Sequence, residues 1–142
     1  KGGDLVKQGY PFYAGAIALS QDVNLKAGNK RLYLDVTGYE GSVLDVRVNG
    51  ASAGVIAWKP YRLDISRFVR DGSNRIEVLL VNSCRNLLGP HHLTRSTRKG
   101  ARYGWIGPMQ FKDRDNWTDK YMFVSQSLGN VRILACNKNA EL

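Results

Sequence analysis

Hydrophobic and polar residues alternate along most of the first half of this chain. Residues 17–25 place isoleucine, leucine or valine at four of the five odd positions, and small or polar side chains at the even ones. The same two-residue period recurs in residues 32–36, 43–48 and 76–82, with a returning segment at 53–57. Because successive side chains of a strand point to opposite faces, this period predicts half-buried β-strands.

Short polar or glycine-rich segments separate these runs. Asn49-Gly50 is a strong hairpin signal, because both residue types accept a positive φ. Pro60 excludes a central strand between the returning segment and residues 76–82, since it cannot donate to a ladder. Residues 65–70 are expected to form one short helical turn, which Asp71-Gly72 closes.

The second half of the chain has weaker patterns. Strands are expected near residues 103–111, 121–125 and 131–136, and no window predicts a long amphipathic helix. About eight short strands joined by turns predict an all-β fold, an antiparallel β-sandwich or jelly roll. Residues 84–102 form a long unpatterned segment, and loops of that length are usually functional, ordered against a partner, or disordered. Leu87-Leu88 within it argues against simple disorder.

The length of 142 residues suits one domain, residues 1–142. The opening residues resemble the middle of a protein, so we expect a domain excised from a larger polypeptide. No apolar run approaches the roughly 20 residues of a membrane span, so no membrane partner is expected.

The formal net charge of +9 invites an anionic partner, but the positive residues are scattered, and only residues 95–102 form a true cluster. No zinc-finger spacing, recognition helix or aromatic nucleic-acid motif accompanies them. An acidic polysaccharide or an acidic surface on a neighbouring domain is therefore favoured over nucleic acid. A solvated basic surface without any partner is the alternative.

Candidate reactive groups are few. His91 and His92 are adjacent, so in an extended chain they point opposite ways and do not suit one metal ion. Only three of the 12 acidic residues are glutamates, and a glycosidase needs two facing carboxylates. We therefore predict no catalytic residues, no metal ligands and no required cofactor. Asp113, Asp115 and Asp119 leave a structural calcium open, or they form a hydrated turn. The two cysteines, Cys84 and Cys136, are read as buried free thiols, with one bridge as the alternative.

One combination of features is more specific than the alternation. Residues 46–86 read as strand, Asn-Gly hairpin, strand ending in an aromatic residue, Asp-Ile, short turn, Gly-x-Asn and strand. This resembles the galactose-binding-like β-sandwich domains of multidomain glycoside hydrolases, of the family 2 sugar-binding type. The matching residues are Val46, Val48, Asn49, Gly50, Gly54, Trp58, Tyr61, Asp64, Ile65, Gly72, Asn74, Ile76 and Val78. Residues 9–19 also look like the opening strand of such modules.

The resemblance implies a non-catalytic accessory module of a glycoside hydrolase. Such domains include sugar binders and structural spacers, and they often carry a structural calcium. The implied partners are a carbohydrate and the catalytic domain of the same polypeptide. The implied location is secreted or periplasmic if the parent is a bacterial hydrolase.

The candidate ligand-binding residues follow from this reading. Trp58 and Tyr61 either cover the end of the core or form a stacking platform for a sugar ring. In residues 83–92, Arg85, Asn86, His91 and His92 either bind sugar hydroxyls or a uronate, with Trp105 or Trp117 stacking nearby, or pair across an interdomain contact. In that second reading Leu87, Leu88 and Pro90 bury against a neighbouring domain. We favour the second slightly, because consecutive leucines are poor ligands for a sugar.

Three functions follow, in order of preference. The first is an accessory module that supports a catalytic domain, binds glycan, or does both, and the second is a purely structural interdomain β-sandwich with no ligand. The third is an anion- or nucleic-acid-binding module that acts through the basic surface.

Overall fold

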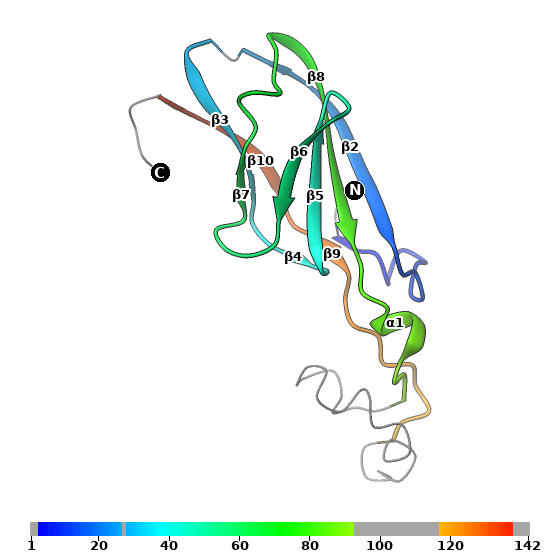
Figure 1. Cartoon of the computed structure of the whole chain (residues 1–142). Helices are drawn as coiled ribbons and strands as arrows, with labels where there is room; N and C mark the ends of the chain where they lie inside the picture. The colour runs from blue at the N-terminus through cyan, green and yellow to red at the C-terminus, as the bar shows by residue number, and fades with distance from the viewer. Residues whose placement is uncertain (1–2, 27, 93–116, 138–142) are drawn as a thin grey trace.

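The computed structural model describes residues 3–26, 28–92 and 117–137, and all its strands pair in antiparallel fashion (Figure 1). One sheet has the order β2 (Ala16–Leu25), β8 (Gly72–Val81), β5 (Val43–Val48) and β6 (Ala51–Ile56). The facing sheet has the order β10 (Val131–Asn137), β3 (Lys30–Val36) and β7 (Arg62–Asp64). A small third sheet orders β1 (Gly3–Asp4), β9 (Ser127–Leu128) and β4 (Tyr39–Glu40).

The hydrophobic core lies between the four-stranded sheet and the sheet built on β3. Both contribute alternate residues, and Leu34, Leu44, Val46 and Leu80 are fully buried. The residues next to them on the same strand face outward, as the two-residue period requires. The predicted all-β antiparallel sandwich is confirmed, because these alternating faces can be buried only against one another.

The predicted hairpin turn is present between β5 and β6. Asn49 and Gly50 both have positive φ, at 53° and 82°, which matches the twist of the flanking strands. The turn before β8 depends on Asn74, which is fully buried. Its amide donates to the carbonyls of Arg70 and Gly72 and accepts from the Arg70 backbone N–H.

Several expected elements differ from the structure. Residues 121–125 are not a strand, because their backbone bonds to side chains and loops rather than to a ladder. Residues 65–70 contain a single turn, in which Phe68 N–H donates to Ile65 O, and no helix. The expected strand at 103–111 lies outside the described residues.

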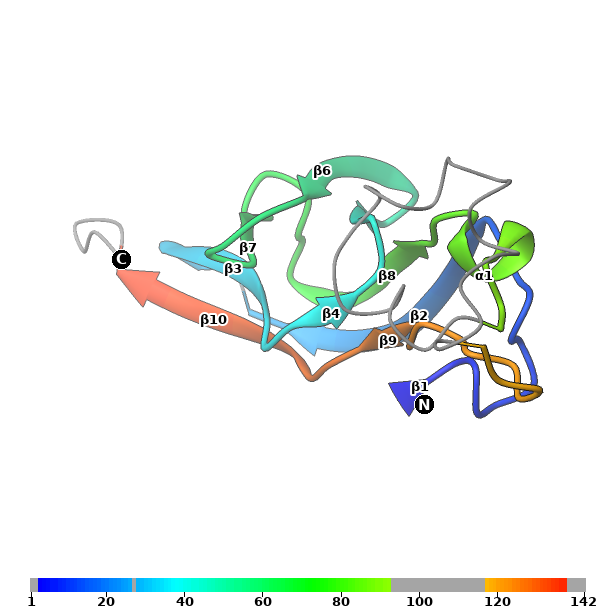
Figure 2. The ribbon, with the colours of Figure 1, turned by 90° about the horizontal axis from the view of Figure 1, so that it is seen from below.

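Five short elements were not expected, namely the strands β1, β4, β7 and β9 and the helix α1. Strand β7 follows Pro60 after only one residue, and a run of three residues is too short to show a period. Helix α1 (Arg85–Leu88) is a single turn inside the segment expected to be unpatterned. The four-residue helix and the small sheet lie at the same end of the sandwich (Figures 1 and 2). Within the described part of the chain, no helix has the length and apolarity needed to cross a membrane.

Candidate functional site

Six rings from three distant parts of the sequence meet beside α1. We call them the aromatic cluster, and its members are Phe12, His91, His92, Trp117, Tyr121 and Phe123. Phe12 packs edge-on against His91, Tyr121 and Phe123, with ring centroids 4.9–5.6 Å apart. Edge-to-face and stacked contacts at these distances favour one arrangement of the rings. The cluster therefore fixes the end of the sandwich next to α1.

Asn86 anchors α1 to this end. Its side chain is fully buried, the amide nitrogen donates to Val124 O at 2.8 Å, and Val124 N–H donates to the amide oxygen at 2.8 Å. Both polar groups of the side chain thus complete the backbone hydrogen bonding of residues 121–125. This geometry favours a structural role for Asn86 over the sugar contact predicted from sequence.

The two histidines each donate one hydrogen bond to a backbone carbonyl. His91 Nε2 lies 2.7 Å from Asn86 O, and His92 Nδ1 lies 2.9 Å from Thr118 O. A carbonyl only accepts, so Nε2 of His91 and Nδ1 of His92 carry the protons. The His92 ring stacks on Trp117 at 4.9 Å. The adjacent histidines therefore serve different contacts, as their sequence position predicts.

Backbone hydrogen bonds also join the described segments that precede residue 93 and follow residue 116. Thr118 N–H donates to His92 O at 2.9 Å, and Met122 N–H donates to His91 O at 2.6 Å. Trp105, a predicted stacking residue, lies outside the described residues. So does the basic cluster at 95–102.

The surface of α1 itself is apolar and exposed. Leu87 is 49% exposed and Leu88 is 78% exposed, while Trp117 and Tyr121 of the aromatic cluster are each at least half exposed. Arg85 is half-buried, and burial lowers the pKa of its guanidinium from the usual value. Exposed apolar surface of this kind, rimmed by polar groups, is typical of an interaction site.

The loop between β6 and β7 carries the remaining predicted residues. Trp58 is 79% exposed, so it does not cover the core, and that part of the sequence interpretation is wrong. Tyr61 does pack against the core, edge-on to Tyr39 at 5.1 Å. The Tyr39 hydroxyl donates to the carbonyls of Ile56 or Ala57, at 3.2 and 3.0 Å, which ties this loop to β4.

The predicted site residues therefore fall into two separate places. Arg85, Asn86, His91, His92 and Trp117 gather at the α1 end, and Trp58 and Tyr61 lie in the β6–β7 loop, apart from α1 in both ribbon views (Figures 1 and 2). Sequence reasoning missed Phe12, Tyr121 and Phe123. Residues 10–13, expected to open a strand, instead form turns that bring Phe12 to the cluster. The density of aromatic residues at 10–13 and 121–123 was the available signal.

A third feature is an open groove of about 610 Å³ along the small sheet. Polar and small residues make up most of its lining, which comprises Gly3, Asp4, Lys7, Thr37, Gly38, Tyr39, Glu40, Ser125, Ser127, Leu128 and Gly129. Ser127 Oγ donates to Glu40 Oε2 at 3.0 Å, and Asp4 Oδ1 accepts from the backbone N–H groups of Val6 and Gln126. Both carboxylates are thus already engaged within the protein.

The described residues hold no group of three histidine, cysteine, aspartate or glutamate side chains arranged for a metal ion. Asp113 and Asp115, two members of the predicted calcium loop, lie outside the described residues, and Asp119 accepts from Trp117 Nε1 at 3.4 Å. The calcium prediction stays a prediction. Cys84 and Cys136 are both free thiols, but the expectation that they are buried is wrong, because Cys84 is exposed and Cys136 is half-buried.

No protein-family model and no curated protein matches this sequence. Solved structures, however, are similar to it. A rhamnosidase from Novosphingobium sp. PP1Y is 27% identical over 87% of this chain, with a TM-score of 0.57, and the match spans 11% of that enzyme. A β-glucuronidase from Bifidobacterium dentium, complexed with coumarin-3-O-glucuronide, is 13% identical over 89% of this chain and 22% of that enzyme, with a TM-score of 0.55. The chain is thus similar to a small part of each, and the second likeness concerns the fold alone.

Proposed function

We propose that this chain is a non-catalytic accessory module of a larger glycoside hydrolase, with the galactose-binding-like β-sandwich type of fold. Its first role is to dock against the catalytic domain of the same polypeptide through the α1 end. The observation that carries this proposal is the exposed Leu87-Leu88 pair on a rigidly anchored helical turn. The likeness to a rhamnosidase supports it, because the match takes up only 11% of that enzyme, as expected of one module within a larger hydrolase.

The α1 end has the properties of a preformed docking surface. Its exposed members are apolar, while Asn86 and the histidines hydrogen-bond inward to backbone carbonyls. Burying an exposed leucine contributes about 1.5–3 kcal/mol, so two leucines and the neighbouring rings can stabilise an interdomain contact. A site for a polar sugar would instead present hydrogen-bonding groups outward.

Glycan binding is the second proposed role, and Trp58 supports it. A tryptophan that is 79% exposed on a tethered loop offers a flat face to the C–H side of a sugar ring. Trp117, 50% exposed and backed by His92, offers another such face. Exposed aromatic side chains held by packing behind them are suited to recognition.

Docking is tested with the double variant Leu87→Ser/Leu88→Ser, made both in this chain and in the longer polypeptide that contains it. In this chain alone the melting temperature stays unchanged, because both leucines are exposed. In the longer polypeptide, hydrogen exchange at residues 85–92 rises and the first melting transition falls. Val55→Ser, at a residue 57% exposed on β6, is the control and changes neither. Equal exchange at 85–92 in this chain and in the longer wild-type polypeptide would contradict docking.

Glycan binding is tested with an array of neutral and uronic-acid oligosaccharides at physiological salt. We expect one glycan class to bind, with Trp58→Ala or Trp117→Ala weakening it by at least about tenfold. Val55→Ala is the matched exposed control. A folded chain that binds no glycan would leave docking as the function.

A further inference from the structure

The outer face of the sheet β10-β3-β7 carries an ordered row of charged residues. On β3, Arg31, Tyr33 and Asp35 alternate with the buried leucines and so point away from the core. The strand register places Arg62 and Arg132 on either side of Asp35, and Asp64 beside Tyr33. Directly opposite residues of paired strands lie on the same face, so these side chains share one surface.

Asp35 sits between two guanidinium groups. Arg62 Nε and Nη2 both lie 3.1 Å from Asp35 Oδ1, and Arg132 Nη2 lies 2.6 Å from Asp35 Oδ2. One carboxylate thus faces two cations, which leaves one net positive charge. The Arg132 side chain is 59% exposed at the edge of the sheet, and within the described residues its other nitrogens have no partner. Those nitrogens remain available to an anion.

A second pair of cations lies further along the same face. Arg31 and Arg67 act electrostatically on the Asp64 carboxylate, which also accepts from Ser66. On β3, Tyr33 lies between Arg31 and Asp35, and it pairs with Asp64 of β7. We call the whole set the arginine face: Arg31, Tyr33, Asp35, Arg62, Asp64, Arg67 and Arg132. Its four arginines and two aspartates leave a formal charge of +2.

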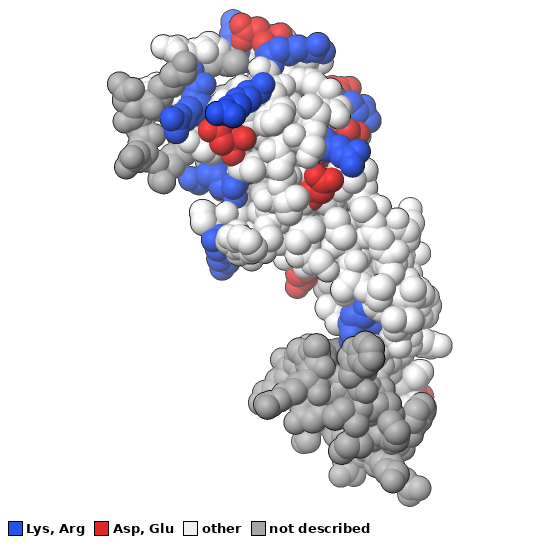
Figure 3. Space-filling model, in the orientation of Figure 1, with Lys and Arg blue, Asp and Glu red and all other residues white. Residues whose placement is uncertain are grey.

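Figure 3 shows how the charges are distributed over the described surface. Lys and Arg side chains lie over the upper part of the sandwich, on the side of β3 and β7 and also on the side of β2 and β8, with acidic groups among them. Few charged side chains are visible on the lower part of this view that the grey atoms leave open. The arginine face is therefore spatially distinct from the apolar α1 end.

The exposed Trp58 lies next to this face in the chain. Its loop ends at Arg62, where Arg62 N–H donates to Pro60 O at 2.7 Å, and Val36 N–H donates to Tyr61 O at 2.9 Å. These bonds hold the loop against the β3 segment that carries Asp35. The loop that carries Trp58 therefore joins the sheet β10-β3-β7 at the end where Arg62 and Arg132 contact Asp35.

We propose that the arginine face binds an oligosaccharide that carries carboxylates, a uronate chain, with Arg132 as its main anion contact. This inference rests on the proposed function, because it names the class of glycan that such a module binds. The planar guanidinium matches a carboxylate in a bidentate geometry that a neutral sugar cannot use. Tyr33 and the loop of Trp58 supply ring surface beside the charges.

Nucleic acid fits this face less well. Duplex DNA carries one charge per about 1.7 Å of its axis, and its affinity depends on many simultaneous phosphate contacts. Asp35 and Asp64 lie among the arginines and would repel such dense charge. A uronate chain carries only one carboxylate per sugar, so Arg132 at the sheet edge can bind one without further anions lying against Asp35 or Asp64.

The test measures binding of hexagalacturonate by calorimetry at physiological salt, against the same hexamer with every carboxylate methyl-esterified. We expect the acid form to bind the intact chain at least about tenfold more tightly than the ester, and Arg132→Gln to weaken the acid form by about tenfold. Arg67→Gln is the second variant, because Arg67 makes no hydrogen bond within the described residues that its loss would break.

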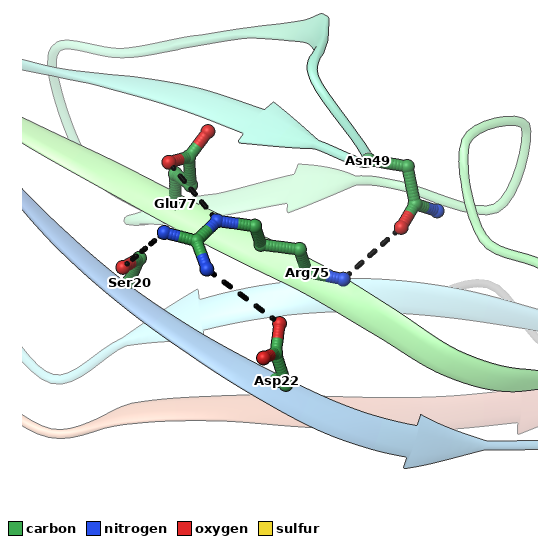
Figure 4. Close-up of polar contacts among 5 residues, drawn as sticks. All are labelled: Ser20, Asp22, Asn49, Arg75 and Glu77. Carbon is green, nitrogen blue, oxygen red and sulfur yellow. Dashed lines mark hydrogen bonds and ion pairs between the residues drawn. The ribbon is translucent and has the colours of Figure 1, made fainter.

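Arg75→Gln is the matched control, because it removes the same charge from the other sheet. Arg75 contacts Ser20, Asp22 and Glu77 on the outer face of the four-stranded sheet, and its side chain is 53% exposed (Figure 4). Its backbone N–H donates to Asn49 Oδ1, a bond that the substitution retains (Figure 4). We expect Arg75→Gln to bind hexagalacturonate as the unmodified chain does.

Four results would overturn the inference. Equal weakening by Arg132→Gln and Arg75→Gln would show diffuse attraction, and tighter binding of a 20-base-pair DNA than of hexagalacturonate would favour nucleic acid. Equal binding of acid and ester, abolished by Trp58→Ala, would refute the arginine face while leaving glycan binding intact. Binding of neither hexamer, with other glycans bound on the array, would likewise refute this inference and not the proposed function.

Discussion

Asn74 and Asn86 are fully buried amides that satisfy backbone groups where no strand can do so. Asn74 shapes the turn before β8, and Asn86 holds residues 121–125 against α1. An amide offers both a donor and an acceptor, so one side chain replaces two missing ladder bonds. At the residue scale, these two asparagines stabilise segments of the fold that the alternation of hydrophobic and polar residues does not predict.

Replacing Asn86 with alanine tests this role. We expect Asn86→Ala to lower the free energy of unfolding by about 2–4 kcal/mol, because the partly buried Val124 N–H and O lose their partners and a fully buried side chain is removed. Urea unfolding measures the change. Asn24→Ala, at an exposed position of β2, is the control and should shift stability by less than about 0.5 kcal/mol. A similar small change for Asn86→Ala would show that water replaces the amide at no cost.

At the scale of elements, Asp35 joins three strands. The hydrogen bond from Arg132 lowers the pKa of Asp35, and the neighbouring Arg62 lowers it further, against the raising effect of burial. Because both arginines lie on the flanking strands β10 and β7, one carboxylate ties the whole sheet together. The short β7 depends on this contact more than the long strands do.

The lowered pKa gives the pH dependence a definite sign. A carboxyl whose pKa is lower in the folded than in the unfolded state contributes stability above its unfolded pKa, near 3.8–3.9, and loses it as the pH falls further. We therefore expect Asp35→Asn to reduce stability at pH 7 and to flatten the loss of stability between about pH 4 and pH 2. Urea midpoints across that range measure the effect. A parallel shift at every pH would contradict the assignment to Asp35.

The strands show how far the sequence could predict the fold. Residues 17–25 and 43–48 alternate because each strand turns one face to the core, and the structure confirms strands there and at 131–136, where the pattern is weaker. Strand β7 and helix α1 are too short for any period, and residues 121–125 take an extended path that a side chain stabilises.

The candidate sites were predictable only in part. Trp58 and Leu88 stood out from the sequence and are exposed. The aromatic cluster and the arginine face were not predicted, because both depend on contacts between residues such as Phe12 and Phe123, or Asp35 and Arg132, about a hundred positions apart.

At the scale of the whole molecule, apolar side chains occupy two contrasting environments. Leu34 is fully buried between the sheets, while Leu88 is 78% exposed at the α1 end. Leu34 stabilises the sandwich from within, and Leu88 is available for contact with another domain.

Substitution of leucine by alanine should affect stability differently in these two environments. We expect Leu34→Ala to lower the free energy of unfolding by about 3–5 kcal/mol, because it leaves a cavity in the core. Leu88→Ala removes the same atoms from an exposed position, and in this chain alone it should change stability by less than about 0.5 kcal/mol. Calorimetric unfolding of both variants provides the comparison. A large loss for Leu88→Ala would mean that its side chain already packs within this chain.

The pairing of β10 with β3 has a consequence for how the molecule forms. Lys30 pairs with Asn137, so the two strands are about a hundred residues apart in the chain. During synthesis the edge of β3 on that side stays open until the ribosome has made nearly all of the intervening sequence. Non-local pairing of this kind slows folding and exposes unpaired strand edges to other chains. The sandwich therefore closes only after β10 has been made, and a chaperone that shields β3 would act before β10 emerges.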